Sequence, residues 1–182
     1  GTGTKFSAFT NNASASVTSV SVTRGPLAGG TAITITGTGF TGTDNVTIGD
    51  INATSIVTVS STSITAVTPA GAAASAKDVN VSNSTNGNGG LAGGFTYNAR
   101  PTVTSTTPNR GPIAGGTAIT IIGTGFSNDS AGTNTVTIDG AAATSVTVNS
   151  DTNITCVTPA RTSGAKDINV TNANGTGGLG SA

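Results

Sequence analysis

A block of 24 residues occurs twice in the chain, and this repeat limits the fold more than any other feature. The segment VTSVSVTRGPLAGGTAITITGTGF (17–40) returns as VTSTTPNRGPIAGGTAITIIGTGF (103–126), with 18 of 24 positions identical. Two shorter blocks also recur, ITAVTPA as ITCVTPA and KDVNVSN as KDINVTN. Differences in length fall only between these blocks, where surface loops tolerate them. The repeat predicts two copies of one domain, 15–98 and 99–182, after an N-terminal segment 1–14.

Each copy reads as a series of short strands. Apolar and polar residues alternate in ITIT (33–36), VTI (46–48) and VNV (79–81), the period of a half-buried strand. The segments RGPLAGGT and RGPIAGGT combine Pro with paired Gly and predict tight reversals between strands. About seven strands within some 85 residues predict an all-β fold of two tandem β-sandwiches.

These motifs resemble the IPT/TIG domain, an immunoglobulin-like module found in plexins, some transcription factors and many microbial surface proteins. The resemblance covers both copies and depends on the G-P-x-x-G-G-T turn, the G-T-G-F that closes the next strand, and the later T-P-A. Copy two also has the Pro that the family favours before the turn, Pro108, where copy one has Val22. The resemblance implies immunoglobulin-like sandwiches, but it implies no chemistry.

Composition argues against an enzyme and against a nucleic-acid partner. The 182 residues include no His and no Glu, and seven Lys plus Arg balance seven Asp. We see no nucleophile with a base beside it and no converging metal ligands, and we expect no cofactor. The loop 127–134 holds one Asp, which is too few for a good calcium site. Some family members bind DNA through sandwich loops, but Arg24 and Arg110 are isolated charges.

Other sequence features are compatible with a secreted or cell-surface location. No run of about 18 apolar residues could insert into a membrane. The chain begins at Gly1 without a basic and apolar leader, which leaves a removed signal peptide and a shortened chain equally open. The single Cys156 matches Ala66 of the first copy, so we expect a small buried side chain. The repeated Lys-Asp pairs at 77–78 and 166–167 are expected to lie at solvated strand ends.

The two copies differ at their last strand. In the first copy NGNGGLAGG is followed by FTYNARP, whereas the matching NGTGGLGSA of the second copy is followed by no such segment. Copy two is therefore expected to lack its own last strand and to have an open acceptor groove. An open sheet edge and unpaired buried backbone groups favour pairing with another chain. The candidate groove residues are Ile119, Ile121, Ile168, Val170 and Leu179.

A segment like the last strand stands at the other end of the chain. In AFTNNASASV, Ala8-Phe9-Thr10 matches Gly94-Phe95-Thr96 in the same frame in which Val17 matches Val103. This predicts donation of the N-terminal strand into the second domain of a neighbour. The candidate donor residues are Lys5, Phe6, Ala8, Phe9 and Thr10.

The register of this donated strand is less well defined than its identity. Asn11 stands where the first copy has Tyr97, and Phe6 is out of phase with Phe9. A bulge or a second contact for Phe6 would be needed.

Nine N-x-S/T sequons stand in the chain, which is rich in Asn and Thr and so produces some by chance. We expect Asn80 and Asn169 to point outward and to accept glycans sterically. The full set is Asn12, Asn45, Asn52, Asn80, Asn83, Asn128, Asn153, Asn169 and Asn174.

The sequence favours a structural protein whose partner is itself. One donor and one acceptor at opposite ends give head-to-tail contacts, which propagate as an extracellular filament unless they close into a ring. Two alternatives stay open. The chain could be a two-domain piece of a multi-repeat surface adhesin, or a module that binds glycans, receptors or other cells through its loops. Neither a nucleic-acid partner nor membrane insertion is expected.

Overall fold

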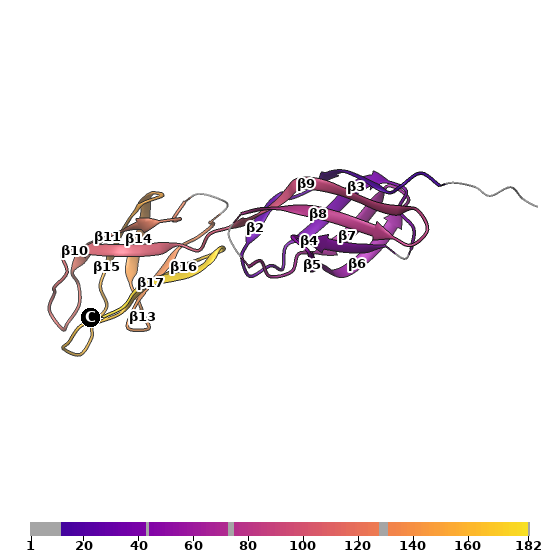
Figure 1. The fold of residues 1–182 in the computed structure, drawn as a ribbon. Helices are drawn as coiled ribbons and strands as arrows, with labels where there is room; N and C mark the ends of the chain where they lie inside the picture. The colour runs from indigo at the N-terminus through magenta and orange to yellow at the C-terminus, as the bar shows by residue number, and fades with distance from the viewer. Residues whose placement is uncertain (1–11, 43, 73–74, 128–130, 182) are drawn as a thin grey trace, which may run out of the picture.

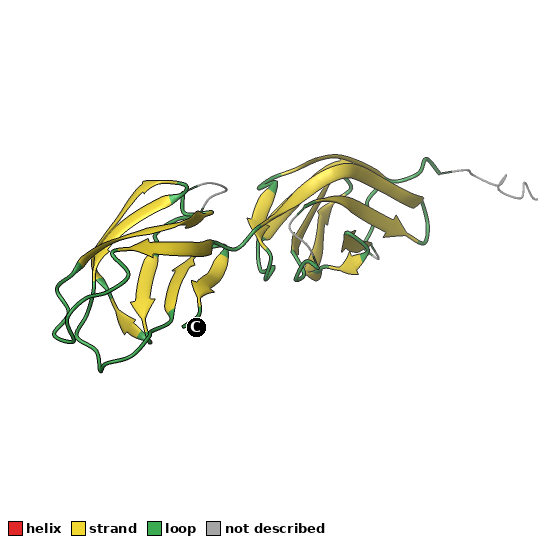
Figure 2. Ribbon diagram, turned by 60° about the vertical axis from the view of Figure 1, so that its left-hand side comes forward, coloured by secondary structure: helices red, strands yellow, loops and turns green. Residues whose placement is uncertain are grey.

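The computed structural model describes residues 12–42, 44–72, 75–127 and 131–181, and every regular element in them is a β-strand. The strands form two domains that lie end to end, joined between β9 (Gly87–Asn98) and β10 (Thr102–Thr107) (Figure 1). Each domain is a sandwich of two sheets, as Figure 2 shows from a second direction. The predicted all-β fold of two tandem immunoglobulin-like sandwiches is confirmed.

The first domain packs a four-stranded sheet, in the order β1-β3-β7-β6, against a five-stranded sheet, in the order β2-β9-β8-β4-β5. All neighbouring strands are antiparallel except β2 and β9, which run parallel. Its strands are β1 (Ser16–Val20), β2 (Arg24–Pro26), β3 (Ala32–Thr38), β4 (Asn45–Ile48), β5 (Ile51–Asn52), β6 (Thr54–Ser60), β7 (Ser63–Val67), β8 (Ala76–Asn83) and β9.

The second domain repeats this arrangement with two four-stranded sheets, in the orders β10-β11-β15-β14 and β13-β12-β16-β17. Its strands are β10, β11 (Ala118–Thr124), β12 (Thr135–Ile138), β13 (Ala141–Ala142), β14 (Thr144–Ser150), β15 (Asn153–Val157), β16 (Ile168–Asn172) and β17 (Gly175–Leu179).

The alternating apolar residues of both copies form the two cores. Side chains of β3, β4 and β8 in the first domain and of β11, β12 and β16 in the second face inward between the sheets. The residues predicted from the alternation are buried, namely Ile33, Ile35, Val46, Ile48, Val79 and Val81. Burying such aliphatic side chains is the main source of stability in a sandwich of this size.

Glycines fix two features of the repeated motif. In the G-P-x-x-G-G-T turn, Gly29 and Gly30 have φ angles of 76° and 84°, which favour glycine, and the Gly29 N–H donates to Pro26 O at 2.9 Å. In the G-T-G-F motif, a Cβ on Gly37 would lie 2.6 Å from the ring of Phe40, so only glycine leaves room for this buried ring.

The two domains differ where the chain leaves the first domain. β9 spans 12 residues, whereas its counterpart β17 spans 5, and β8 spans 8 residues where β16 spans 5. The counterpart of β2, residues 110–112, is not a strand. β2 forms because it pairs with the second half of β9. In the described part of the second domain, no strand lies beside 110–112.

Candidate functional site

The second half of β9 closes the first domain with two aromatic side chains. Phe95 and Tyr97 are 0% and 2% exposed, and their rings meet edge to face with centroids 5.1 Å apart. The Tyr97 hydroxyl donates to Pro69 O at 2.7 Å. A Cβ on the buried Gly25 of β2 would lie 3.0 Å from the tip of the Phe95 ring. This strand therefore fills the space between the two sheets at this end of the domain.

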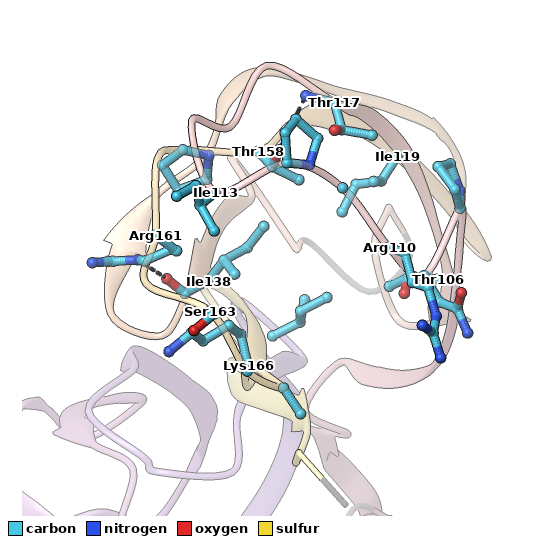
Figure 3. A pocket seen from close by; sticks show the side chains of 18 of the residues that line it. Thr106, Arg110, Ile113, Thr117, Ile119, Ile138, Thr158, Arg161, Ser163 and Lys166 are labelled. Carbon is cyan, nitrogen blue, oxygen red and sulfur yellow. Dashed lines mark hydrogen bonds between the residues drawn. The ribbon is translucent and has the colours of Figure 1, made fainter.

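The matching space in the second domain is an open groove of about 820 Å³. Its walls come from the end of β10, the loop after it, the start of β11, the end of β12, the loop 158–166, and β16 and β17 (Figure 3). Several lining side chains have counterparts in or against the first-domain core cluster that also holds Phe95 and Tyr97, namely Thr106, Ile113, Ile119, Ile138, Ile168 and Leu179. Strands line this groove, but no strand among the described residues of the second domain fills it as the second half of β9 fills the first domain.

Exposure of matched residues shows what the closing strand covers. Ile113 is 66% exposed, whereas its counterpart Leu27 is partly buried and packs against the first core. Gly25 is buried, but the matching Gly111 is exposed. The exposed Ile113 side chain lines the groove together with Ile119 and Ile138.

The groove has an apolar floor and a basic rim. Arg110, Arg161 and Lys166 all line it. Lys166 Nζ pairs with Asp139 Oδ2 at 3.3 Å, and Arg161 Nε donates to Ile138 O at 2.9 Å. Such a groove can bury the side chains of an extended segment and hydrogen-bond its backbone, and we find no arrangement in it for bond-breaking chemistry.

The predicted acceptor residues divide into two groups. Ile119, Ile168 and Leu179 line the groove. Ile121 and Val170 are fully buried in the second core and do not line it. The predicted donor residues Lys5, Phe6, Ala8, Phe9 and Thr10 lie outside the described residues.

Among the lining residues that the sequence did not predict, Ile113, Ile138 and Arg161 matter most for the argument. Ile113 could have been found from its copy-one partner Leu27 in the RGPLAGG turn. Arg161 had a signal too, because it follows T-P-A where the first copy has Gly71.

The sequons differ in how accessible their Asn side chains are. Asn83 and Asn174 are 5% and 3% exposed, and Asn83 Nδ2 already donates to Thr41 Oγ1 at 2.6 Å. The better exposed ones are Asn12, Asn45, Asn52, Asn80, Asn153 and Asn169, whereas Asn128 lies outside the described residues.

Burial or hydrogen bonding shifts the pKa of three titratable groups. Burial raises the pKa of the Tyr97 hydroxyl and of the Cys156 thiol. Cys156 is buried, as predicted from Ala66. The backbone N–H of Ser181 donates to Asp167 Oδ1 at 2.6 Å and lowers the pKa of that carboxyl.

Two further observations concern metals and membranes. Among the residues that the structure describes, no three His, Cys, Asp or Glu side chains lie close enough together to hold a metal ion. The described part of the chain also contains no helix that is long and apolar enough to cross a membrane. The loop 127–134, which the sequence disfavours as a calcium site, lies partly outside the described residues.

The fold is similar to that of several solved structures. The plexin A4 extracellular region matches 92% of this chain over 18% of its own length, at 19% identity and a TM-score of 0.46. SGBP-B from a xyloglucan utilization locus in Bacteroides uniformis matches 92% of this chain over 49% of its own length, at 19% identity and a TM-score of 0.40. The I9-I11 tandem from titin matches 90% over 64%, at 9% identity and a TM-score of 0.44. No curated protein matches the chain by sequence.

The family model for the IPT/TIG domain matches the chain twice, over residues 15–98 and 101–182. This is an immunoglobulin-like domain family and not a catalytic one. The two matches cover both sandwiches and nearly all of the described residues. The chain therefore belongs to the IPT/TIG domain family, as a tandem of two such domains.

Proposed function

We propose that this chain is a structural subunit of an extracellular filament, in which the N-terminal strand of one copy inserts into the second domain of the next. The observation that carries the proposal is the groove of the second domain, which lies where the first domain places Phe95 and Tyr97 of β9. Strand addition of this kind joins subunits through backbone hydrogen bonds and seats alternate side chains in pockets.

The N-terminal segment matches the strand that such a groove needs. Ala8-Phe9-Thr10 corresponds to Gly94-Phe95-Thr96 of β9, and the distance in sequence to the following strand is the same, because Val17 and Val103 stand in the same frame. Phe9 would take the place that Phe95 has in the first domain. The link between neighbouring subunits would then have the same length as the link between the two domains of one chain.

Burial and hydrogen bonding give this contact a large gross stabilisation. Removing one Phe side chain from water contributes roughly 1.5–3 kcal/mol. Each backbone hydrogen bond in the new ladder adds about 0.5–1.5 kcal/mol. The loss of freedom on association offsets part of this sum. A donor of about seven residues would still dissociate slowly, because its whole ladder must open together.

Placement of donor and acceptor on one chain sets the form of the assembly. Each copy offers one strand and one groove, so the contacts run head to tail and propagate as a fibre unless they close into a ring. We propose an extracellular location, with glycans on sequon residues that are not buried, which include the half-buried Asn80 and Asn169. Asn83 and Asn174 are excluded from this proposal because they are buried.

A second candidate function is a piece of a multi-repeat surface protein that binds glycans, receptors or other cells. One observation favours it. The Ser181 N–H donates to Asp167 just as the Gly93 N–H donates to Asp78, at 2.6 and 2.8 Å. The chain therefore follows the path of the first domain up to Ser181. In a longer protein, residues after 182 could enter the groove from the same chain.

Electron microscopy and a peptide-binding assay separate the two functions. We would compare the full chain with a chain lacking residues 1–11, and add a peptide of residues 1–14 to the shortened chain. Cys156 reports on the second domain, since it is the single Cys and is 2% exposed. A thiol reagent would measure how often this domain opens.

We expect fibres from the full chain and none from the shortened one. The peptide should slow labelling of Cys156 by about tenfold or more, because a ligand that binds only the folded domain suppresses its opening. A peptide with Phe9→Asp is the matched control and should give no protection. Fibres from both chains would contradict the filament and favour the surface module. Monomers whose Cys156 labelling rate is unchanged by the peptide would do the same.

A further inference from the structure

One position in the groove differs between the domains in a way that bears on which strand can enter. Gly71 and Arg161 follow the same T-P-A motif. Their backbones are placed alike, because Gly71 N donates to Leu27 O at 2.9 Å and Arg161 N donates to Ile113 O at 2.8 Å. The difference between glycine and arginine is therefore a true substitution at one site.

In the first domain, the Tyr97 ring requires this glycine. A Cβ built on Gly71 would lie 2.7 Å from two atoms of the Tyr97 ring, which is closer than real Cβ contacts come. The ring itself is held in place, since it is 2% exposed and its hydroxyl bonds to Pro69 O at 2.7 Å. A side chain at position 71 and a tyrosine at position 97 thus exclude each other.

In the second domain, Arg161 puts a Cβ where Gly71 has none. Its side chain lies along the rim of the groove, and Nε donates to Ile138 O at 2.9 Å (Figure 3). This bond ties the loop 158–166 to the end of β12. A tyrosine ring placed in the second domain as Tyr97 is placed in the first would therefore meet the Arg161 Cβ.

The N-terminal strand carries the complementary change. Its residue matched to Tyr97 is Asn11. An asparagine has no ring to bury and can take other side-chain rotamers beside Arg161. A glycine that faces tyrosine in the first domain thus corresponds to an arginine that would face asparagine in the second.

We infer that Arg161 makes the groove select a strand with a short polar residue two positions after its phenylalanine, as in residues 8–12 of a second copy. The same residue rejects strands of the Phe95-Thr96-Tyr97 type. This inference rests on the proposed function and names the partner of its groove. As a consequence, the groove of the second domain cannot accept the closing strand of a first domain. Accepting that strand would join copies in the wrong order.

Calorimetric titration of peptides into the chain that lacks residues 1–11 tests the inference. The peptides are residues 1–14 and the same peptide with Asn11→Tyr. The chains carry Arg161, Arg161→Ala or Arg161→Gly. We expect the Asn11→Tyr peptide to bind the Arg161 chain at least about tenfold more weakly than the unchanged peptide. Arg161→Gly should restore its binding, and Arg161→Ala should not, because alanine keeps the Cβ.

The outcomes distinguish the inference from the proposed function. Equal or tighter binding of the Asn11→Tyr peptide to the Arg161 chain would overturn selection by Arg161, while strand donation would stand. Rescue by both Arg161→Ala and Arg161→Gly would also overturn it, since the block would then not lie at the Cβ. Failure of the unchanged peptide to bind any of the three chains would overturn the proposed function itself. The Cys156 labelling rate of each chain, without peptide, reports whether the substitution has opened the fold.

Discussion

The two domains share most of their sequence motifs, but they differ in how each is closed. In the first, the second half of β9 pairs with β2 and buries Phe95 and Tyr97. In the second, the same walls surround an open groove. The first residues of the RGPxAGG turn thus form a strand, β2, where β9 pairs with them. In the second domain the matching residues 110–112 have no such partner among the described residues and form no strand. The comparison teaches that an immunoglobulin-like domain can keep its core even where no strand of the described chain fills one end of the sandwich.

The largest expected effect comes from removing the phenylalanine of each closing strand. Phe95→Ala should lower the free energy of unfolding of the first domain by about 3–5 kcal/mol, because it leaves a cavity in a packed core. Tyr97 is the only Tyr, and the chain has no Trp, so its fluorescence follows the first domain alone in a urea titration. The matched change Phe9→Ala should leave this transition unchanged and prevent fibre formation. Equal effects of both substitutions on the Tyr97 transition would contradict the comparison.

A side chain at position 71 should have the next largest effect. Gly71→Ala places a Cβ 2.7 Å from the Tyr97 ring and should destabilise the first domain by about 1–3 kcal/mol through overpacking. The matched change Arg161→Gly should leave the Tyr97 transition unaltered. If Gly71→Ala proved neutral, residue 161 would lose its role in excluding tyrosine.

The Tyr97 hydroxyl should make the first domain sensitive to high pH. Its folded-state pKa is raised by burial, so it contributes stability below the ordinary tyrosine pKa of about 10 and loses it as pH rises through the folded value. Urea titrations followed by far-ultraviolet circular dichroism between pH 8 and 11 should show the midpoint of unfolding of the first domain moving to lower urea as the pH rises. Tyr97→Phe should remove this dependence and cost about 1 kcal/mol at neutral pH, since Pro69 O loses its partner. A pH dependence that survives Tyr97→Phe would assign it to another group.

The smallest effect is expected at Asp167, whose carboxylate accepts the Ser181 N–H. Its folded-state pKa is lowered, so its contribution is present above the ordinary aspartate pKa and is lost as pH falls through the folded value. Asp167→Asn should therefore speed amide exchange at Ser181 at neutral pH and change little in acid. The matched change Asp78→Asn tests the Gly93 N–H in the same way. If amide exchange at Ser181 did not change, the inference that the chain at Ser181 follows the path of the chain at Gly93 would be contradicted.

The fold could be predicted because its signals are local and occur twice. Alternation in segments such as ITIT (33–36) predicts strands with one buried face, and the paired glycines predict the turns that have positive φ. The different lengths of β8 and β16 could not be predicted in this way. Their sequences, KDVNVSN and KDINVTN, are almost the same, and the extra pairs of β8 form only because β9 continues beside it.

The groove could be predicted only in part, since periodicity tells which face of a strand is inward but not how deep a residue lies. Ile121 and Ile119 alternate on the same face, yet Ile121 is fully enclosed and Ile119 lines the groove. Arg161 was missed because it stands in a loop, where no pattern of burial applies. Only its comparison with Gly71, and the position of the Tyr97 ring, gives it a role.

Disulfide trapping between copies tests the central claim most directly. In the first domain Arg24 is paired with Thr96 across the parallel strands β2 and β9, so the same pair across copies would be Arg110 and Thr10. Neighbouring strands lie about 4.8 Å apart, within reach of a disulfide. Cys156→Ala, which copies Ala66, removes the other thiol.

The chain with Thr10→Cys, Arg110→Cys and Cys156→Ala should give a ladder of covalent multimers on a non-reducing gel. The control with Arg24→Cys, Thr96→Cys and Cys156→Ala should close within single chains. We predict the ladder from the first chain and only monomer from the control. Monomer from both, under conditions in which the control disulfide forms, would contradict strand donation between copies.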